Sequence, residues 1–142
     1  MPKPSVSPMK FIQDMWAARV SLTLIAAVEL DVFTTIAQGK RTAAEVARAI
    51  KVPLRGLERM LDALTGLGYL TKRGSRFGLS PTAQTFLVRG KPAFLGAMAD
   101  ESRMTLPGWI QLTDVVRFGR PVANVDSDQG LMCSPWRNIG GG

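Results

Sequence analysis

The chain has 142 residues, of which 46% are hydrophobic, so it is long enough for one domain with an apolar core. Its formal net charge of +7 suits a polyanionic partner but does not define a fold. Histidine is absent and Cys133 is the single cysteine, which excludes histidine-based catalytic or metal sites and an internal disulfide.

The first predicted element is a long helix that follows an extended, proline-rich leader, residues 1–8. Ser7 can cap this helix and Pro8 can open it, because a proline in the first turn costs no hydrogen bond. Apolar side chains between Met9 and Val28 spread almost around the whole circumference, and such a helix needs partners on most sides. A second copy of the chain is the simplest partner, and later helices of the same chain are the alternative. The candidate dimer-interface residues are Ile12, Trp16, Val20 and Leu24.

The N-terminal region also bears on where the protein resides. Its most apolar window, residues 20–28, is interrupted by Ser21 and Thr23 and is far shorter than the roughly 20 apolar residues that span a bilayer. No signal-peptide pattern precedes Met9. We therefore expect no membrane segment and a cytoplasmic protein.

A short helix with a strong start signal comes next. Helical apolar spacing continues to Ile36 and stops at residues 38–40. Thr42 and Glu45 then form a capping box, in which the Thr42 hydroxyl accepts from the Glu45 amide and the Glu45 carboxylate reaches back to the cap. We expect a helix from this cap to about Ile50.

The sequence that follows predicts the rest of a winged helix-turn-helix. Pro53 opens a second helix with apolar residues at i, i+3, i+4 and i+7, and Gly66 and Gly68 end it. Two short strands, residues 69–71 and 76–79, surround a basic, glycine-containing turn. A hairpin after a helix-turn-helix is a wing.

Three further helices are expected after the wing. Ser80 and Pro81 cap the first, which Gly90 ends, and the others run over residues 92–103 and 106–117. Their buried candidates are Phe94, Leu95, Met98, Trp109, Ile110, Leu112, Val115 and Val116. The fold class is thus mainly α, a winged helix-turn-helix with a two-stranded β-hairpin and additional N- and C-terminal dimerisation helices over residues 9–122.

The order of these signals resembles the N-terminal dimerisation region of plant-type, hydroxyindole or acetylserotonin-like, O-methyltransferases and their bacterial polyketide-tailoring relatives. The runs that carry the resemblance are AAVELDVFTTIAQG from Ala26, TAAEVARAI from Thr42, RGLERMLDALTGLGYL from Arg55, FGLSPTAQTFL from Phe77 and WIQLTDVVRFGRPV from Trp109. With the long helix in front of them, the resemblance spans residues 9–122, about four fifths of the chain. Each run alone is common, and their order and spacing make the resemblance moderately specific.

The resemblance implies a homodimer whose first helices interlock and whose helices help to wall the substrate pocket of a following S-adenosylmethionine-dependent catalytic domain. Phe11, Met15 and Trp16 match the region that such enzymes lend to the partner's pocket, whereas Met98, Met104 and Trp109 match the lining of the chain's own pocket. The alternative for all six is ordinary core or dimer packing. The implied substrate is a hydroxylated aromatic compound or a polyketide.

The C-terminal residues depart from this family. Residues 123–142 do not continue into the strand and glycine-rich turn that would begin a cofactor-binding sheet. We expect an irregular tail there, no cofactor bound by this chain, and no methyl transfer by the chain alone. Mixed dimers with a full-length methyltransferase are a further hypothesis.

A winged-helix regulator that binds DNA is the rival interpretation. Basic residues gather between Lys40 and Lys91. They could contact DNA if the second helix of the helix-turn-helix entered the major groove and the wing lay on the phosphate backbone. The DNA-contact candidates are Lys51, Arg55, Arg59, Lys72, Arg73 and Arg76. Against this, the presumptive recognition helix has few Asn, Gln, Ser or Thr side chains to read base edges.

Overall fold

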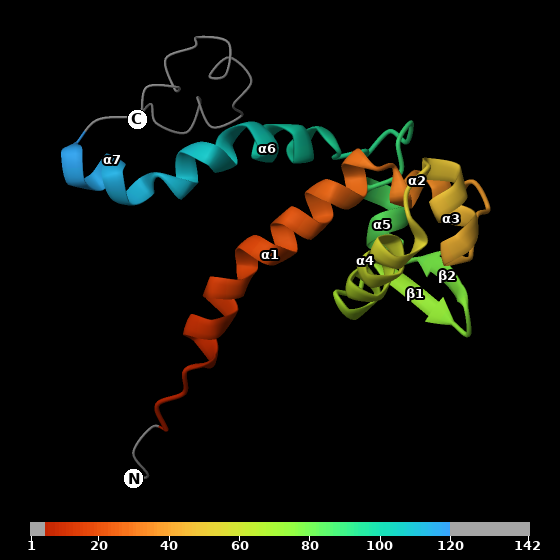
Figure 1. Cartoon of the computed structure of the whole chain (residues 1–142), viewed down its shortest axis with the longest axis horizontal. Coiled ribbons are helices and arrows are strands. Elements are labelled where there is room, and N and C mark those ends of the chain that lie inside the picture. Colours follow the sequence, from red (N-terminus) through yellow and green to blue (C-terminus); the bar gives the residue numbers. More distant parts are fainter. Residues whose placement is uncertain (1–4, 120–142) are drawn as a thin grey trace. The chain divides into compact units, whose positions relative to one another are not determined.

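The computed structural model describes residues 5–119 (Figure 1). The chain divides into two compact units, Met1–Gly96 and Ala97–Gly142, which are described separately. The first unit contains α1 (Met9–Glu29), α2 (Val32–Ala37), α3 (Ala43–Ile50), α4 (Leu54–Gly66), β1 (Leu70–Arg73), β2 (Arg76–Leu79) and α5 (Pro81–Phe86). The second contains α6 (Ala97–Ile110) and α7 (Leu112–Phe118). The predicted tail, residues 123–142, and Cys133 lie outside the described residues.

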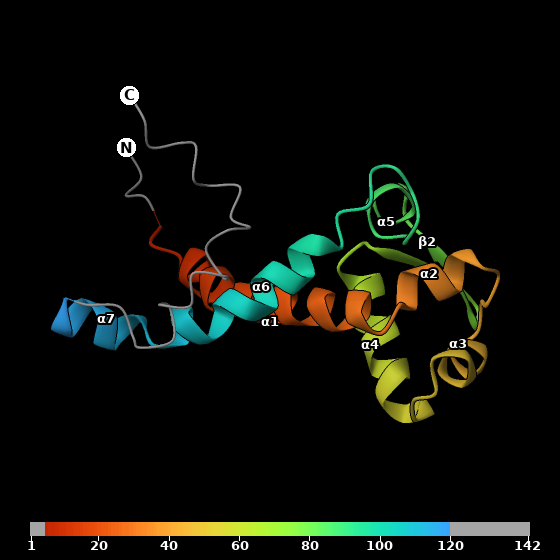
Figure 2. The same ribbon diagram turned by 90° about the horizontal axis from the view of Figure 1, so that it is seen from above.

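The long N-terminal helix forms where the sequence predicts it. Ser7 Oγ accepts a hydrogen bond from the Met9 amide at 3.3 Å, and Pro8 occupies the N-cap. Only the last turns of α1 are buried, at Ile25, Ala27 and Val28. The preceding turns extend away from the rest of the first unit (Figures 1 and 2).

A break that the sequence did not predict separates α1 from α2. Asp31 adopts a left-handed conformation with φ of 55° at the N-cap of α2. The Arg89 guanidinium lies 2.9 Å from the Asp31 carboxylate, and the Arg89 amide donates to Thr34 Oγ1 at 3.0 Å. These contacts join the end of the unit to its beginning and hold α2 at its angle to α1.

The capping box is confirmed atom by atom. Thr42 Oγ1 accepts from the Glu45 amide at 3.2 Å, and Glu45 Oε2 accepts from the amides of Thr42 at 3.0 Å and Arg41 at 2.8 Å. Lys51, with φ of 58°, ends α3. The sequence predicted Pro53 as the first helical residue of α4. In the structure Pro53 is the N-cap, and the helix begins one residue later, at Leu54.

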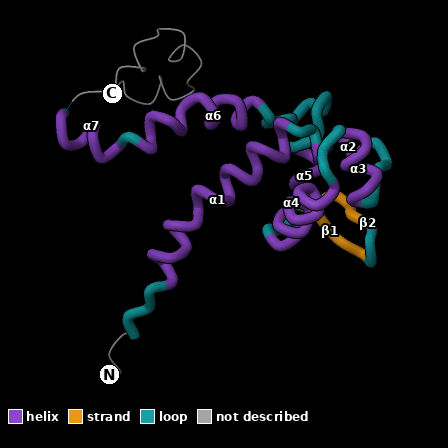
Figure 3. The backbone as a smooth tube through the Cα atoms, viewed as in Figure 1, coloured by secondary structure: helices purple, strands orange, loops and turns teal. Residues whose placement is uncertain are grey.

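The predicted wing is also present, as the two orange strands of Figure 3. β1 and β2 are antiparallel, with Leu70 opposite Leu79 and Arg73 opposite Arg76. Leu70 and Phe77 are buried, so one face of the hairpin covers the core. Ser80 Oγ accepts from the Ala83 amide at 3.2 Å and caps α5, as expected.

The core of the first unit lies between the helix-turn-helix, the hairpin and α2. Its fully buried large side chains are Phe33, Ile36, Leu61, Leu64, Val32 and Val46. They occur at the helical spacing that the sequence showed. The predicted fold class, mainly helical with one two-stranded hairpin, is therefore confirmed.

The helices of the second unit differ from their prediction. The expected boundaries were residues 92–103 and 106–117, but α6 runs through Pro107 and the break falls at Gln111. Pro107 is exposed, so water can satisfy the carbonyl that loses its helical partner. Most of the residues predicted to be buried are exposed: Leu95, Met98, Trp109, Ile110, Leu112 and Val116. Leu95 precedes α6, in the first unit, and the other five lie on α6 and α7, two short helices with too little apolar surface of their own to cover them.

Candidate dimer and substrate-pocket surface

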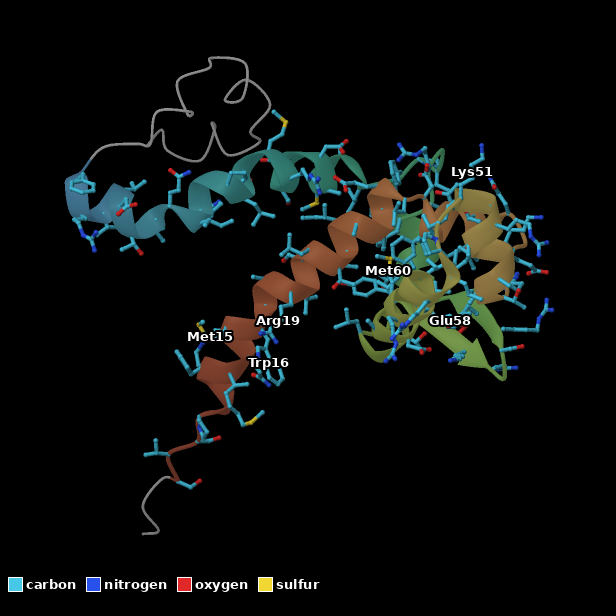
Figure 4. The ribbon with its side chains drawn as sticks, in the orientation of Figure 1. Met15, Trp16, Arg19, Lys51, Glu58 and Met60 are labelled. Carbon is cyan, nitrogen blue, oxygen red and sulfur yellow. The ribbon has the colours of Figure 1, made fainter. Side chains whose placement is uncertain are left out.

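The N-terminal half of α1 presents large apolar side chains to solvent. Phe11 is 69% exposed, Met15 61% and Trp16 56%, although core helices normally bury such residues. Figure 4 shows Met15, Trp16 and Arg19 on the part of α1 that extends from the first unit. Of the predicted interface residues, Trp16 is exposed and Ile12, Val20 and Leu24 are half-buried. This helix therefore carries a contiguous apolar surface without a partner in its own unit.

Polar groups on the same helix are arranged so that they leave that surface open. Lys10 pairs with Asp14 at 2.7 Å one turn along the helix, and the Arg19 guanidinium lies 6.0 Å from the centre of the Trp16 ring. Ser21 and Thr23 return their hydroxyls to carbonyls of the preceding turn. Lys10 and Asp14 are thus paired, and both hydroxyls are hydrogen-bonded, within the helix itself.

The other predicted pocket residues lie on α6, in the second unit. Met98 is 61% exposed, Met104 68% and Trp109 66%. The structure therefore divides the six predicted pocket residues into two sets, with Phe11, Met15 and Trp16 on α1. Each set is exposed and apolar, as a surface that meets another molecule or domain would be.

The predicted DNA-contact residues do not form a uniformly positive surface. Arg55 and Arg59 are exposed on α4, but they alternate with the exposed Glu58 and Asp62. Figure 4 labels Glu58 on this helix. Lys72 Nζ is 2.7 Å from the Asp62 carboxylate and is therefore already paired. A DNA backbone lying along α4 would approach two carboxylates, which opposes the regulator hypothesis.

The acidic groups of the described chain have structural roles or solvent contacts. The pKa of Glu45 lies below its usual value because the amides of Arg41 and Thr42 donate to its carboxylate, with smaller help from the Thr42 hydroxyl and the positive charge of Arg76. Glu45 thus serves as a helix cap. Over residues 5–119 no three His, Cys, Asp or Glu side chains gather closely enough to hold a metal ion.

The first unit is a helical domain whose α1 leaves large apolar side chains uncovered, as a surface for assembly does. Residues 13–89 match the O-methyltransferase dimerisation domain. The chain belongs to this family, as the sequence resemblance predicted. It carries the dimerisation domain of S-adenosylmethionine-dependent O-methyltransferases, and such a domain self-associates.

Individual relatives agree with this assignment. Over 111 residues the chain is 35% identical to the 3-hydroxy-5-methyl-1-naphthoate 3-O-methyltransferase of Streptomyces sahachiroi, covering 77% of this chain and 32% of that protein. It is 36% identical over 114 residues to the tetracenomycin polyketide synthesis 8-O-methyl transferase TcmO of Streptomyces glaucescens, covering 79% and 34%. The structure of human N-acetylserotonin methyltransferase with SAM superposes with a TM-score of 0.72 at 26% identity, covering 84% of this chain and 37% of that one. The chain thus spans about a third of the length of these relatives.

The family assignment also bears on α1 and membranes. By length and hydropathy alone, the 21 residues of α1 suffice to cross a bilayer, which the shorter window of residues 20–28 did not suggest. A core helix of a soluble protein passes the same test. Most of α1 lies within residues 13–89, the part that matches the dimerisation domain.

Proposed function

We propose that this chain forms the dimerising and substrate-pocket half of an S-adenosylmethionine-dependent O-methyltransferase that acts on a hydroxylated aromatic compound or a polyketide. The observation that carries the proposal is the uncovered apolar surface of α1, centred on Phe11, Met15 and Trp16. Relatives named for naphthoate and polyketide methylation support the substrate class.

The dimer would form by pairing of α1 with α1 of a second copy. Fully burying one large apolar side chain contributes about 1.5–3 kcal/mol, and each copy exposes several on this helix. Trp16, which is 56% exposed, would lie in the interface with the half-buried Ile12, Val20 and Leu24 along the same helix. About a twofold axis, the apolar surface of α1 in each copy would cover the same surface of the other copy.

The substrate pocket would combine side chains from the two sets of exposed residues. Phe11, Met15 and Trp16 of one copy would reach the pocket of the other, which its own Met98, Met104 and Trp109 would line. Aromatic faces and methionine sulfur suit a flat aromatic substrate, because both make close dispersion contacts with rings. S-adenosylmethionine would be held by a catalytic domain of the kind that the longer relatives have, so a full-length methyltransferase is a proposed partner in mixed dimers.

The solution mass measured by light scattering tests the dimer. We expect the wild-type chain to be a dimer, and Trp16→Asp to be a monomer or to unfold because a carboxylate cannot be buried unpaired in the interface. Leu24→Asp should likewise give a monomer or an unfolded chain. Val6→Asp is the matched control, since Val6 is 99% exposed and lies outside α1. A dimer that persists in both α1 variants would refute the proposal.

Fluorescence of the tryptophans tests the pocket. Titration with a hydroxynaphthoic acid should quench Trp16 and Trp109 in the wild-type dimer, and part of the quenching should disappear in Trp16→Phe and in Trp109→Phe. If quenching persists unchanged in the monomeric Trp16→Asp chain, the pocket is not shared between the copies and this part of the proposal fails.

A further inference from the structure

The outer face of the wing gathers positive charge that neither dimerisation nor the substrate pocket uses. Residues alternate between the two faces of a strand, so Thr71 and Arg73 share one face with their partners Gly78 and Arg76. Leu70 and Phe77, on the opposite face, are buried. The face with the arginines therefore points away from the core.

A third arginine is held against this face by the backbone. The Arg41 carbonyl accepts a hydrogen bond from the Phe77 amide at 2.7 Å, and Thr42 forms a bridge with Arg76. A Cβ on Gly78 would lie 3.6 Å from Arg41 Nη1 and 2.8 Å from Thr71 Oγ1. The guanidinium of Arg41 thus lies over Gly78, beside the Thr71 hydroxyl.

These groups surround a depression of about 500 Å³. Its lining consists of Arg41, Thr71, Lys72, Arg73, Arg76, Phe77 and Gly78. Because Gly78 has no side chain, Thr71 Oγ1 and Arg41 Nη1 can approach its backbone closely at the floor of the depression. The depression therefore offers several guanidinium donors and one hydroxyl around a single open space.

The positive charges are only partly compensated by acidic groups. Arg73 and Arg76 are directly opposite each other, an arrangement that destabilises a hairpin unless an anion lies between them. Lys72 is paired with Asp62. Glu45 is near Arg76, but its Oε2 already accepts from two backbone amides. In the described part of the chain, Arg41, Arg73 and Arg76 form no salt bridge.

We propose that this wing-face depression binds the phosphate groups of a small phosphorylated ligand, with Arg41, Arg73 and Arg76 as the ligating residues. Planar guanidinium groups bind phosphate oxygens in pairs, and the Thr71 hydroxyl supplies a further donor. A compact ligand is favoured over duplex DNA because the neighbouring α4 presents Glu58 and Asp62, which would repel a phosphate backbone that continued beyond the hairpin.

Pyrophosphate is the probe that tests this site, by calorimetric titration of the full chain and by the backbone amide shifts in its NMR spectrum. We expect saturable binding with the largest shifts at Thr71, Arg73 and Gly78. Arg41→Gln and Arg73→Gln should each weaken binding at least tenfold. Arg55→Gln is the matched control, because Arg55 is exposed on α4 and does not line the depression.

The Arg73→Gln variant also separates binding from folding. Removing one of two opposed like charges should leave the hairpin as stable as the wild type or more so, so a loss of affinity cannot be ascribed to unfolding. Absence of saturable pyrophosphate binding, or equal affinity in Arg41→Gln, Arg73→Gln and wild type, would overturn the proposal. Binding of a short DNA duplex without binding of pyrophosphate would overturn it as well. The dimer mass of the chain is measured separately, so the two proposals fail independently.

Discussion

At the scale of single residues, the capping box that the sequence predicted at Glu45 should make the stability of the fold depend on pH. Its carboxylate caps α3 by accepting from the amides of Thr42 and Arg41, and these bonds lower its pKa. A group whose pKa is lower in the folded state adds stability above its unfolded pKa and loses it as the pH falls through the folded pKa. Protonating Glu45 therefore weakens the start of α3.

A pH series of melting temperatures tests this role. The wild-type chain should be more stable than Glu45→Gln at neutral pH, and the difference should shrink as the pH falls below about 4.3, the usual value for glutamate. Glutamine cannot ionise, so it serves as the non-titrating reference. Glu58→Gln is the control at an exposed glutamate whose side chain does not cap a helix. A Glu45→Gln difference that stays constant with pH would contradict this account.

At the scale of elements, the end of α4 depends on the conformation of one glycine. Gly68 has φ of +84°, which L side chains rarely adopt, whereas Gly66 is helical and a Cβ there would meet nothing within 4 Å. Gly68→Ala should lower the free energy of unfolding by about 1 kcal/mol or more, and Gly66→Ala should leave it unchanged or raise it by up to about 1 kcal/mol. Urea denaturation of both variants measures the difference. Equal effects would show that backbone conformation does not decide where α4 ends.

The elements also show which structural signals are local. The caps at Thr42 and Ser80 and the glycines at the end of α4 were predicted, because each acts over three or four residues of sequence. The break at Asp31 was missed: no glycine or proline marks this left-handed residue, and its ion-pair partner Arg89 is far away in the sequence. The limits of α6 were misplaced because Pro107 is a helix breaker by sequence but remains tolerable in an exposed helix.

For the part of the candidate site on α6, the sequence predicted apolar residues but not their exposure. Periodicity shows that Met98 and Trp109 lie on helices, and it cannot distinguish a side chain buried in its own core from one reserved for another molecule. The wing-face depression was equally out of reach, since it depends on the register that places Arg73 opposite Arg76 and on Arg41 crossing Gly78. The sequence predicted the basic hairpin and named Arg73 and Arg76 as DNA-contact candidates, but it did not add Arg41 to them.

At the scale of the whole molecule, folding and dimerisation should be a single linked equilibrium. The helix that exposes Trp16 and Phe11 is joined to the core only through its last turns, at Ile25, Ala27 and Val28. A second copy that covers α1 therefore stabilises the folded chain by mass action. Tenfold dilution of a dimer that unfolds to separate chains removes about 1.4 kcal/mol of apparent stability, which corresponds to a few degrees in Tm.

This linkage can be tested by thermal melts over a hundredfold range of protein concentration. The wild-type Tm should rise with concentration, and the Tm of Val6→Asp should rise in parallel because Val6 lies outside α1. Any folded Trp16→Asp chain should melt at one temperature whatever its concentration, since its helix can no longer pair. A wild-type Tm independent of concentration would mean that the apolar surface of α1 is covered without a second copy, and the long helix would then need a partner of another kind.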